Sequence, residues 1–163
     1  MIACNLLFPK PTPNGAINVQ CAGGTLLEGR ISHLNGGVDE PGGVSSELLT
    51  RIRSVEWVTF GGLLIRHELI RACGSFDRRY EWAYVMDVDY CFEARLRGFQ
   101  LMQVPVALQH EENRTTRSLW EKKPELRDHI EQNLSQFYAK WKPFYPAFGV
   151  HETLADPVAS RLP

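Results

Sequence analysis

The sequence lacks several features that define large classes of protein. Its four cysteines lie far apart and form no C-x-x-C pair, which argues against a disulfide framework or zinc site and favours reduced thiols in a cytoplasmic protein. No apolar run approaches the ~18 residues of a membrane-spanning helix. The net charge is only −1, so no general attraction to nucleic acid or to an anionic membrane is expected.

The length and composition are those of one globular domain. A chain of 163 residues, 44% hydrophobic and 23% charged, is long enough to bury a core. We expect this domain over residues 1–145 and an irregular, proline-rich tail over 146–163. Residues 28–47 are rich in glycine and show no periodicity, which predicts a long loop.

Strand and helix patterns are mixed along the chain, so the fold class is α/β or α+β. Pro105 predicts a break between two strands within residues 99–110, and Gly74 and Gly98 predict helix ends. We expect helices at 67–74, 87–98 and 124–141, and strands at 2–8, 16–24, 55–66 (two short strands or one kinked strand) and 99–110.

The stretch YVMDVDYCFEARLRGF, residues 84–99, places Asp87 and Asp89 at the start of a predicted helix. In one interpretation Asp87 is the N-cap and Asp89 favours the positive end of the helix dipole. A metal site needs both carboxylates on one cation, but residues i and i+2 of a helix diverge by about 200°. The third interpretation is a catalytic base, with one carboxylate facing a cleft and the other facing protein.

Neighbouring motifs occur in a recognisable order. A hydrophobic strand and glycine turn are followed by LLIR, a short helix, GSFD, an aromatic stretch, DVDYC, a helix, GF, and a strand with a proline and a final histidine. This order resembles the acceptor-side half of an inverting family 2 glycosyltransferase of the GT-A fold. Looser likeness extends to LLFPKPTPNGAINVQCAGG upstream and to HEENRTTRSLW and WKPFYPAF downstream.

The resemblance implies a fold and roles for three residues. The fold would be a truncated GT-A-like α/β domain with a mixed sheet and flanking helices. Asp87 matches the general base that removes a proton from the acceptor hydroxyl, and Asp89 matches a structural carboxylate or an acceptor contact. His110 matches the histidine that helps to bind a divalent cation; its alternative is a solvated histidine at a strand end.

Further substrate contacts follow from the same resemblance, each beside a structural alternative. Gly61 and Gly62 would let a sugar approach the backbone, or form a β-bulge. Aromatic side chains would stack on sugar faces, or pack in the core. Two arginines would neutralise a leaving diphosphate, or be solvated. The residues concerned are the aromatic Trp57, Trp82 and Tyr84 and the basic Arg114 and Arg117.

The sequence also departs from the family pattern. Met86 stands where an acidic or amide residue usually precedes the base, and Glu93 stands where arginine is common, although Arg95 and Arg97 lie nearby. No nucleotide-binding βαβ unit with an acidic D-x-D loop is recognisable before residue 55. We therefore expect a half domain that needs a complementing N-terminal half or self-association, with manganese or magnesium bound only when that half is present. The alternative is a noncatalytic glycan- or protein-binding module, or an oligomeric remnant.

Overall fold

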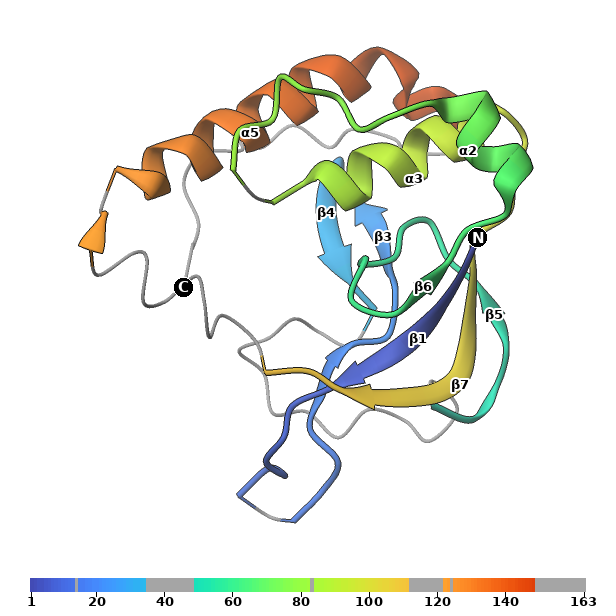
Figure 1. The fold of residues 1–163 in the computed structure, drawn as a ribbon, viewed down its shortest axis with the longest axis vertical. Coiled ribbons are helices and arrows are strands. Elements are labelled where there is room, and N and C mark those ends of the chain that lie inside the picture. The colour runs from blue at the N-terminus through green and yellow to red at the C-terminus, as the bar shows by residue number, and fades with distance from the viewer. Residues whose placement is uncertain (14, 35–48, 83, 112–121, 124, 149–163) are drawn as a thin grey trace.

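The computed structural model describes residues 1–13, 15–34, 49–82, 84–111, 122–123 and 125–148 (Figure 1). It is a mixed α/β structure, as the sequence predicts. No helix of this described part is both long and apolar enough to cross a membrane. The helices are α2 (His67–Cys73), α3 (Met86–Leu96), α5 (Leu126–Trp141) and the 3-10 helix η1 (Lys142–Phe148), and the strands are β1 (Ile2–Leu7), β2 (Val19–Cys21), β3 (Gly24–Leu27), β4 (Arg30–His33), β5 (Arg53–Ser54), β6 (Leu63–Leu64) and β7 (Met102–Gln109).

Strand β1 organises the main sheet, which is mixed and curled. It pairs parallel with β7 and antiparallel with β2 and β6, while β5 pairs with the start of β7. The predicted break at Pro105 is wrong, because β7 is one continuous strand. Its register against β1 shifts between Cys4, opposite Val104, and Asn5, opposite Ala107. A bulge therefore absorbs the proline, which has no N–H for a ladder.

A second sheet is the hairpin of β3 and β4, paired from Gly24↔His33 to Leu27↔Arg30. This hairpin corrects the predicted loop over residues 28–47, because residues 30–33 form β4. Glu28 and Gly29 both have positive φ, 50° and 79°, as a two-residue type I′ turn requires. Gly29 suits the second position of this turn, but glutamate rarely adopts a positive φ, so the dipeptide gave only a weak signal.

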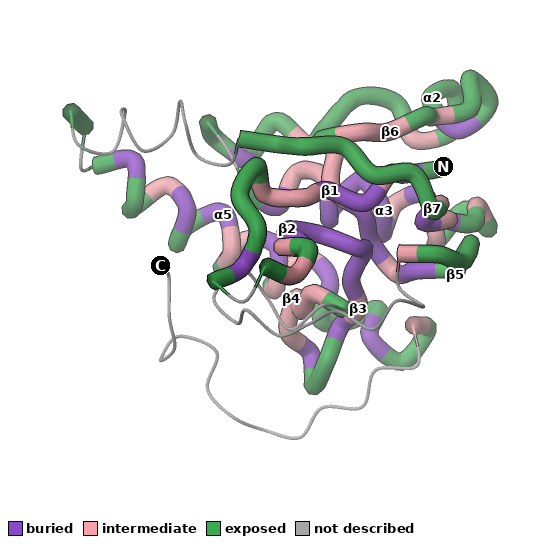
Figure 2. The backbone as a smooth tube through the Cα atoms, turned by 90° about the horizontal axis from the view of Figure 1, so that it is seen from below, coloured by how far each residue is buried: buried purple, intermediate pink, exposed green. Residues whose placement is uncertain are grey.

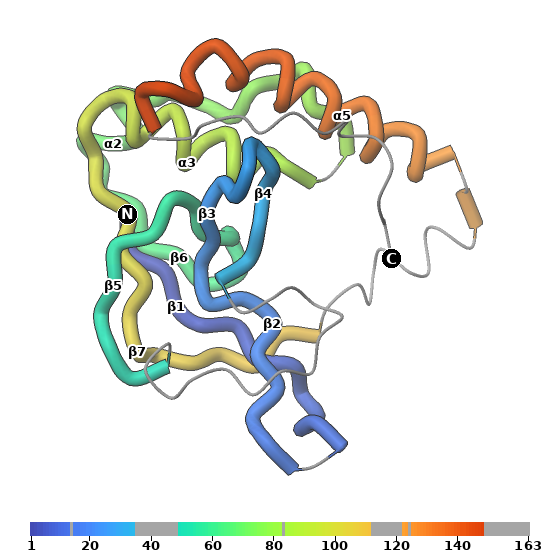
Figure 3. The backbone as a smooth tube through the Cα atoms, turned by 180° about the vertical axis from the view of Figure 1, so that it is seen from behind, coloured from blue at the N-terminus to red at the C-terminus, as the bar shows by residue number. Residues whose placement is uncertain are grey.

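The three helices lie on the same side of the main sheet, and Figures 1 and 3 both show α3 between α5 and the strands. Helix α3 contacts α5 and η1 through aromatic rings. The ring centroid of Phe92 in α3 lies 5.5 Å from that of Phe137 and 5.3 Å from that of Trp141, both in α5, and 5.0 Å from that of Phe148 in η1. Residues 146–148, the start of the tail that was expected to be irregular, belong to η1, and this helix brings Phe148 into the cluster. The aromatic positions of the C-terminal segment are thus part of the core.

Helix α3 is buried on most of its circumference. Residues 88–92 are all buried, whereas Leu96 in the last turn is 41% exposed. Cys91 is fully buried, and its thiol lies 3.6 Å from the carbonyl oxygen of Val58. Figure 2 shows the same pattern, with buried backbone along β1, β2 and α3 and exposed backbone along much of β7.

Candidate functional site

Asp87 lies in the first turn of α3, but it is not the N-cap. The helix begins at Met86, and its N-cap is Val85, with φ 59° and no side-chain capping hydrogen bond. The N-cap interpretation of Asp87 is therefore wrong, because the N-cap lies two residues earlier, at Val85. Its half-buried carboxylate instead accepts hydrogen bonds from backbone amides: Val88 N lies 2.9 Å from Oδ1, and the amide of Phe60 also donates to it.

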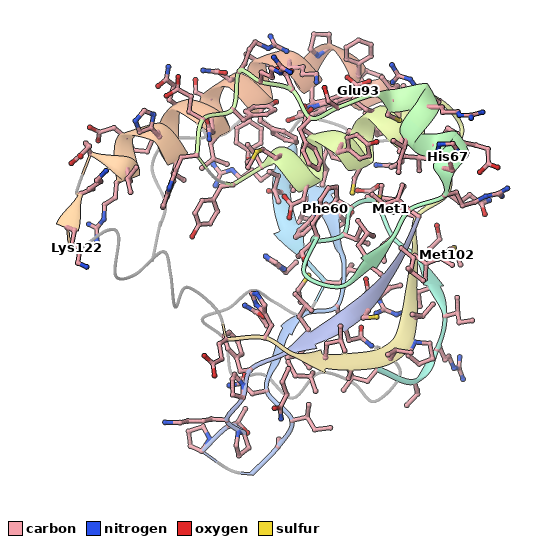
Figure 4. All side chains as sticks on the ribbon, in the orientation of Figure 1. Met1, Phe60, His67, Glu93, Met102 and Lys122 are labelled. Carbon is pink, nitrogen blue, oxygen red and sulfur yellow. The ribbon has the colours of Figure 1, made fainter. Side chains whose placement is uncertain are left out.

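The contact with Phe60 brings Asp87 to the turn that contains Gly61 and Gly62. Figure 4 labels Phe60 on this turn, between α3 and the sheet. A Cβ on Gly61 would lie 2.7 Å from Leu6 Cδ1, and a Cβ on Gly62 would lie 2.8 Å from Leu108 Cδ1. The glycines thus allow the turn to lie directly on the sheet. This is a packing role, and Asp87 is connected to the same turn through the amide of Phe60.

Burial raises the pKa of Asp87, while the backbone amides of Val88, Asp87 itself and Phe60 act in the opposite direction. Two buried thiols share this environment. Burial, with a further contribution from the charge of Asp87, raises the pKa of Cys21 to about 12, and the pKa of Cys91 is raised for the same reasons. The two thiols therefore stay protonated at neutral pH.

Asp89 points away from Asp87, as the helix geometry predicts. It is 3% exposed and accepts hydrogen bonds from Tyr80 Oη at 2.8 Å and Trp141 Nε1 at 2.7 Å. Its Oδ1 also lies 2.8 Å from Lys140 Nζ. The buried carboxylate has several protein partners, which supports its alternative role as a structural carboxylate, and the acceptor contact stays a prediction.

Lys140 Nζ also lies 3.3 Å from Asp77 Oδ2 and 3.1 Å from Glu93 Oε1. Lys140 of α5 therefore binds both the connector before α3 and α3 itself. Glu93, which replaces the arginine expected from the resemblance, additionally pairs with Arg97. Sequence reasoning did not single out Lys140, because it lies among surface-type residues of an amphipathic helix. The presence of three carboxylates around one ammonium group is visible only once α3 and α5 are packed.

His110 follows β7 directly and is exposed. Its backbone N–H donates to Leu7 O at 2.9 Å, and its Nδ1 lies 2.9 Å from Gln20 Oε1. Among the residues that the structure describes, no group of three or more His, Cys, Asp or Glu side chains is placed to hold a metal ion. Divalent cations such as Mg²⁺ and Mn²⁺ need several oxygen ligands. The described residues alone do not supply such a set of ligands, and the role of His110 in binding a cation stays a prediction.

Trp57 is a core residue, which corrects its assignment as a sugar contact. It is 2% exposed, its Nε1 donates to Thr25 O at 3.1 Å, and its ring centroid lies 4.8 Å from that of His33. A Cβ on Gly24 would lie only 1.9 Å from the indole, so the glycine makes room for the ring. The predicted diphosphate-binding residues Arg114 and Arg117 lie outside the described residues.

Trp82 and Tyr84 are exposed aromatic residues that precede α3 in the chain, with 38% and 39% of their surface accessible. They belong to the segment from Tyr80 to Val85, called the arch below, in which residue 83 is not described. The arch leads directly into α3 and therefore into Asp87. Sequence reasoning named both aromatic residues, with core packing as the alternative, and their exposure leaves the sugar-stacking role open.

Comparison with known proteins gives no match: the chain fits no family model, and neither a curated protein nor a solved structure is similar to it.

Proposed function

We propose that this chain is the acceptor-side part of an inverting glycosyltransferase with a GT-A-like fold, and that Asp87 is its general base. The observation that supports this most is the position of Asp87. Its half-buried carboxylate accepts hydrogen bonds from backbone amides of α3 and of the glycine turn, and it follows the exposed aromatic residues Trp82 and Tyr84 closely in the chain. The ordered motifs between residues 55 and 112 supply the second support.

In the proposed reaction Asp87 takes the proton of an acceptor hydroxyl group. The hydroxyl oxygen forms a bond to the anomeric carbon of the donor while the bond from that carbon to the nucleotide diphosphate breaks. The diphosphate leaves with the electron pair, and the configuration at the carbon inverts. A base must be close to the hydroxyl and ionised near the working pH, and burial that raises its pKa also makes it a better proton acceptor.

The donor would be held by a nucleotide-binding half. Before α2, the described strands pair antiparallel with one another, β1 with β2 and β3 with β4, and no parallel βαβ unit is formed among them. We therefore expect the isolated chain to bind uridine or thymidine diphosphate sugars weakly or not at all. Calorimetry with manganese and a panel of these donors tests this, and a Kd tighter than about 100 μM would contradict it.

The decisive variant is Asp87→Asn, assayed for sugar transfer in the presence of the complementing donor-binding half. Transfer is expected to fall by ~10²–10⁴-fold with the circular dichroism spectrum unchanged. Asp128→Asn, which changes an exposed carboxylate in the first turn of α5, is the matched control. Turnover of Asp87→Asn at the wild-type rate would end the assignment of the base.

A noncatalytic glycan-binding module is the second candidate, and the exposure of Trp82 and Tyr84 favours it. Such a module would bind saccharides without donor or metal. Its binding would not depend on the charge of Asp87, so binding and transfer measured on the same Asp87→Asn protein separate the two candidates.

A further inference from the structure

Strand β7 is paired on both of its edges only at its start. On the outer edge, the one away from β1, β5 pairs with Met102 and Gln103, and beyond Gln103 no strand in the described part of the chain continues this pairing. Figure 1 shows β5 beside the start of β7, with the rest of β7 running past it. The residues from Pro105 to Gln109 are all exposed. An edge of this kind carries backbone groups that can pair with another chain.

Hydrogen bonds to β1 show which backbone groups of this edge point outward. The backbone N–H of His110 donates to Leu7 O at 2.9 Å, so the backbone groups of residue 110 are directed toward β1. Because these groups alternate in direction along a strand, the N–H and C=O of Ala107 and of Gln109 are directed toward the outer edge. Pro105 lies before them, at the bulge, and has only a carbonyl to offer.

The charges around the outer edge suit a second copy of the same strand. Residues 99–109 contain no acidic or basic side chain, although charged residues are a common means by which proteins keep strand edges from pairing. Charges of opposite sign flank this segment, Glu111 after the end of β7 and Arg53 in β5 beside its start. A copy that runs in the opposite direction brings the acidic end of each strand to the basic end of the other, which is favourable.

We propose that two copies of this chain form a dimer through the outer edges of β7, antiparallel about a two-fold axis at Leu108. Ala107 of one copy then lies opposite Gln109 of the other, and the pair exchanges both N–H···O=C hydrogen bonds. The Leu108 side chains, 42% exposed in the single chain, meet at the axis. Both copies use the same surface, so the association closes at a dimer and does not continue into a fibre. This inference does not rest on the proposed function.

Sedimentation velocity of the wild type over about 5–500 μM is the first measurement. A reversible dimer with a Kd on the order of 10–100 μM is expected, because a single strand edge forms an interface smaller than the standard size. A monomer throughout this concentration range would overturn the proposal.

Charge variants show whether the dimer uses this edge. Ala107→Lys combined with Gln109→Lys places lysine opposite lysine and is expected to weaken dimerisation at least about tenfold, as is the matching pair of glutamates. Mixing the lysine and glutamate proteins is expected to restore the association as a heterodimer. Leu27→Lys, at an exposed apolar position of β3, is the control and should dimerise as the wild type does. Wild-type affinity in both folded double variants would overturn the use of this edge.

Cysteine variants test the register. In a non-hydrogen-bonded antiparallel pair the Cα atoms lie about 4.5 Å apart, within reach of a disulfide, so Leu108→Cys is expected to give a covalent dimer on mild oxidation. Val106→Cys is the matched control, because its two copies lie about 13 Å apart in this register. The wild type, with its four native cysteines, gives the background on a non-reducing gel. Equal cross-linking of both variants, or none of Leu108→Cys, would overturn the axis at Leu108.

The complementing donor-binding half is the competing occupant of this edge. Loss of the dimer in the lysine variant with sugar transfer unchanged supports the pairing of two copies. A dimer without any transfer also supports it and removes the proposed enzyme. A monomeric wild type whose transfer is lost in the lysine variant would assign the edge to the donor-binding half and overturn the dimer.

Discussion

The ammonium group of Lys140 in α5 lies 2.8 Å from the carboxylate of Asp89 in the first turn of α3. This pair is largely buried, with side-chain exposures of 18% and 4%. Hydrogen bonds from Tyr80 and Trp141 satisfy the same carboxylate. The carboxylate therefore fixes how α3 and α5 meet, and through α3 it sets the direction in which Asp87 points.

Replacing Asp89 by asparagine is expected to lower the free energy of unfolding by about 3 kcal/mol, because removing one partner of a buried ion pair leaves a desolvated charge. The estimate is at the lower end of the usual range because Lys140 keeps Asp77 and Glu93. Urea denaturation measures it, with Asp128→Asn as an exposed control expected within ~0.5 kcal/mol of wild type. An Asp89→Asn protein of unchanged stability but impaired transfer would support Asp89 as a substrate contact.

Asp77 should make the fold sensitive to acid. The Arg79 guanidinium, 2.6 Å away, holds the pKa of this carboxyl well below its usual range, and Lys140 adds to the effect. A depressed folded pKa means that the unfolded chain takes up the proton first as the pH falls. The stabilisation is therefore complete at neutral pH and is lost below about pH 4.

Urea unfolding from pH 7 down to about pH 3 tests this expectation, with Asp77→Asn as the comparison. The variant should be less stable than wild type at neutral pH, and the difference should shrink as the pH falls. A difference that stays constant over this range would show that Asp77 acts through packing or neutral hydrogen bonds rather than through its charge.

Local signals in the sequence were enough to find several elements. Gly74 ends α2 with φ 74°, as a glycine after a short amphipathic segment predicts. The apolar spacing of residues 126–141 gave α5 almost to the residue. These features depend on neighbours within one or two turns, so the chain segment alone contains the information.

The interactions that define the site are not local. Asn133 meets Glu81 across 52 residues, and Tyr80 meets Asp89 only because the arch folds back along α3. The sequence did contain one hint, since an asparagine between Ile130 and Phe137 interrupts an apolar face and implies a buried hydrogen-bond partner. It did not say which backbone group that partner would be. The left-handed conformation of Val85 before α3 could not be predicted from the sequence either, because β-branched residues such as valine rarely adopt it.

Asp87→Asn should combine loss of transfer with retained or increased stability. Because burial raises its pKa, the folded protein binds the Asp87 proton more tightly than the unfolded chain does, and stability falls as the pH rises through the raised value. An asparagine removes this charge while its Oδ1 can still accept the amide hydrogen bonds. Thermal unfolding at neutral pH is the measurement, and a clear decrease in the melting temperature would indicate that the carboxylate is structural.

The strain in the arch gives the last prediction. Trp82→Gly relieves a left-handed residue, which costs roughly 1–2 kcal/mol, but adds glycine's entropy in the unfolded chain, roughly 0.5–1 kcal/mol. With the side chain 38% exposed, the net result is expected to be a gain of about 0.5 kcal/mol in the free energy of unfolding. Phe144→Gly, an equally exposed aromatic residue whose ring lies 5.7 Å from that of Trp141, should instead lose stability. If Trp82 lowers the free energy of unfolding and saccharide binding requires it, its role is in binding and not in stability. Destabilisation of the Trp82→Gly protein by more than about 1 kcal/mol would mean that the indole holds the fold together instead.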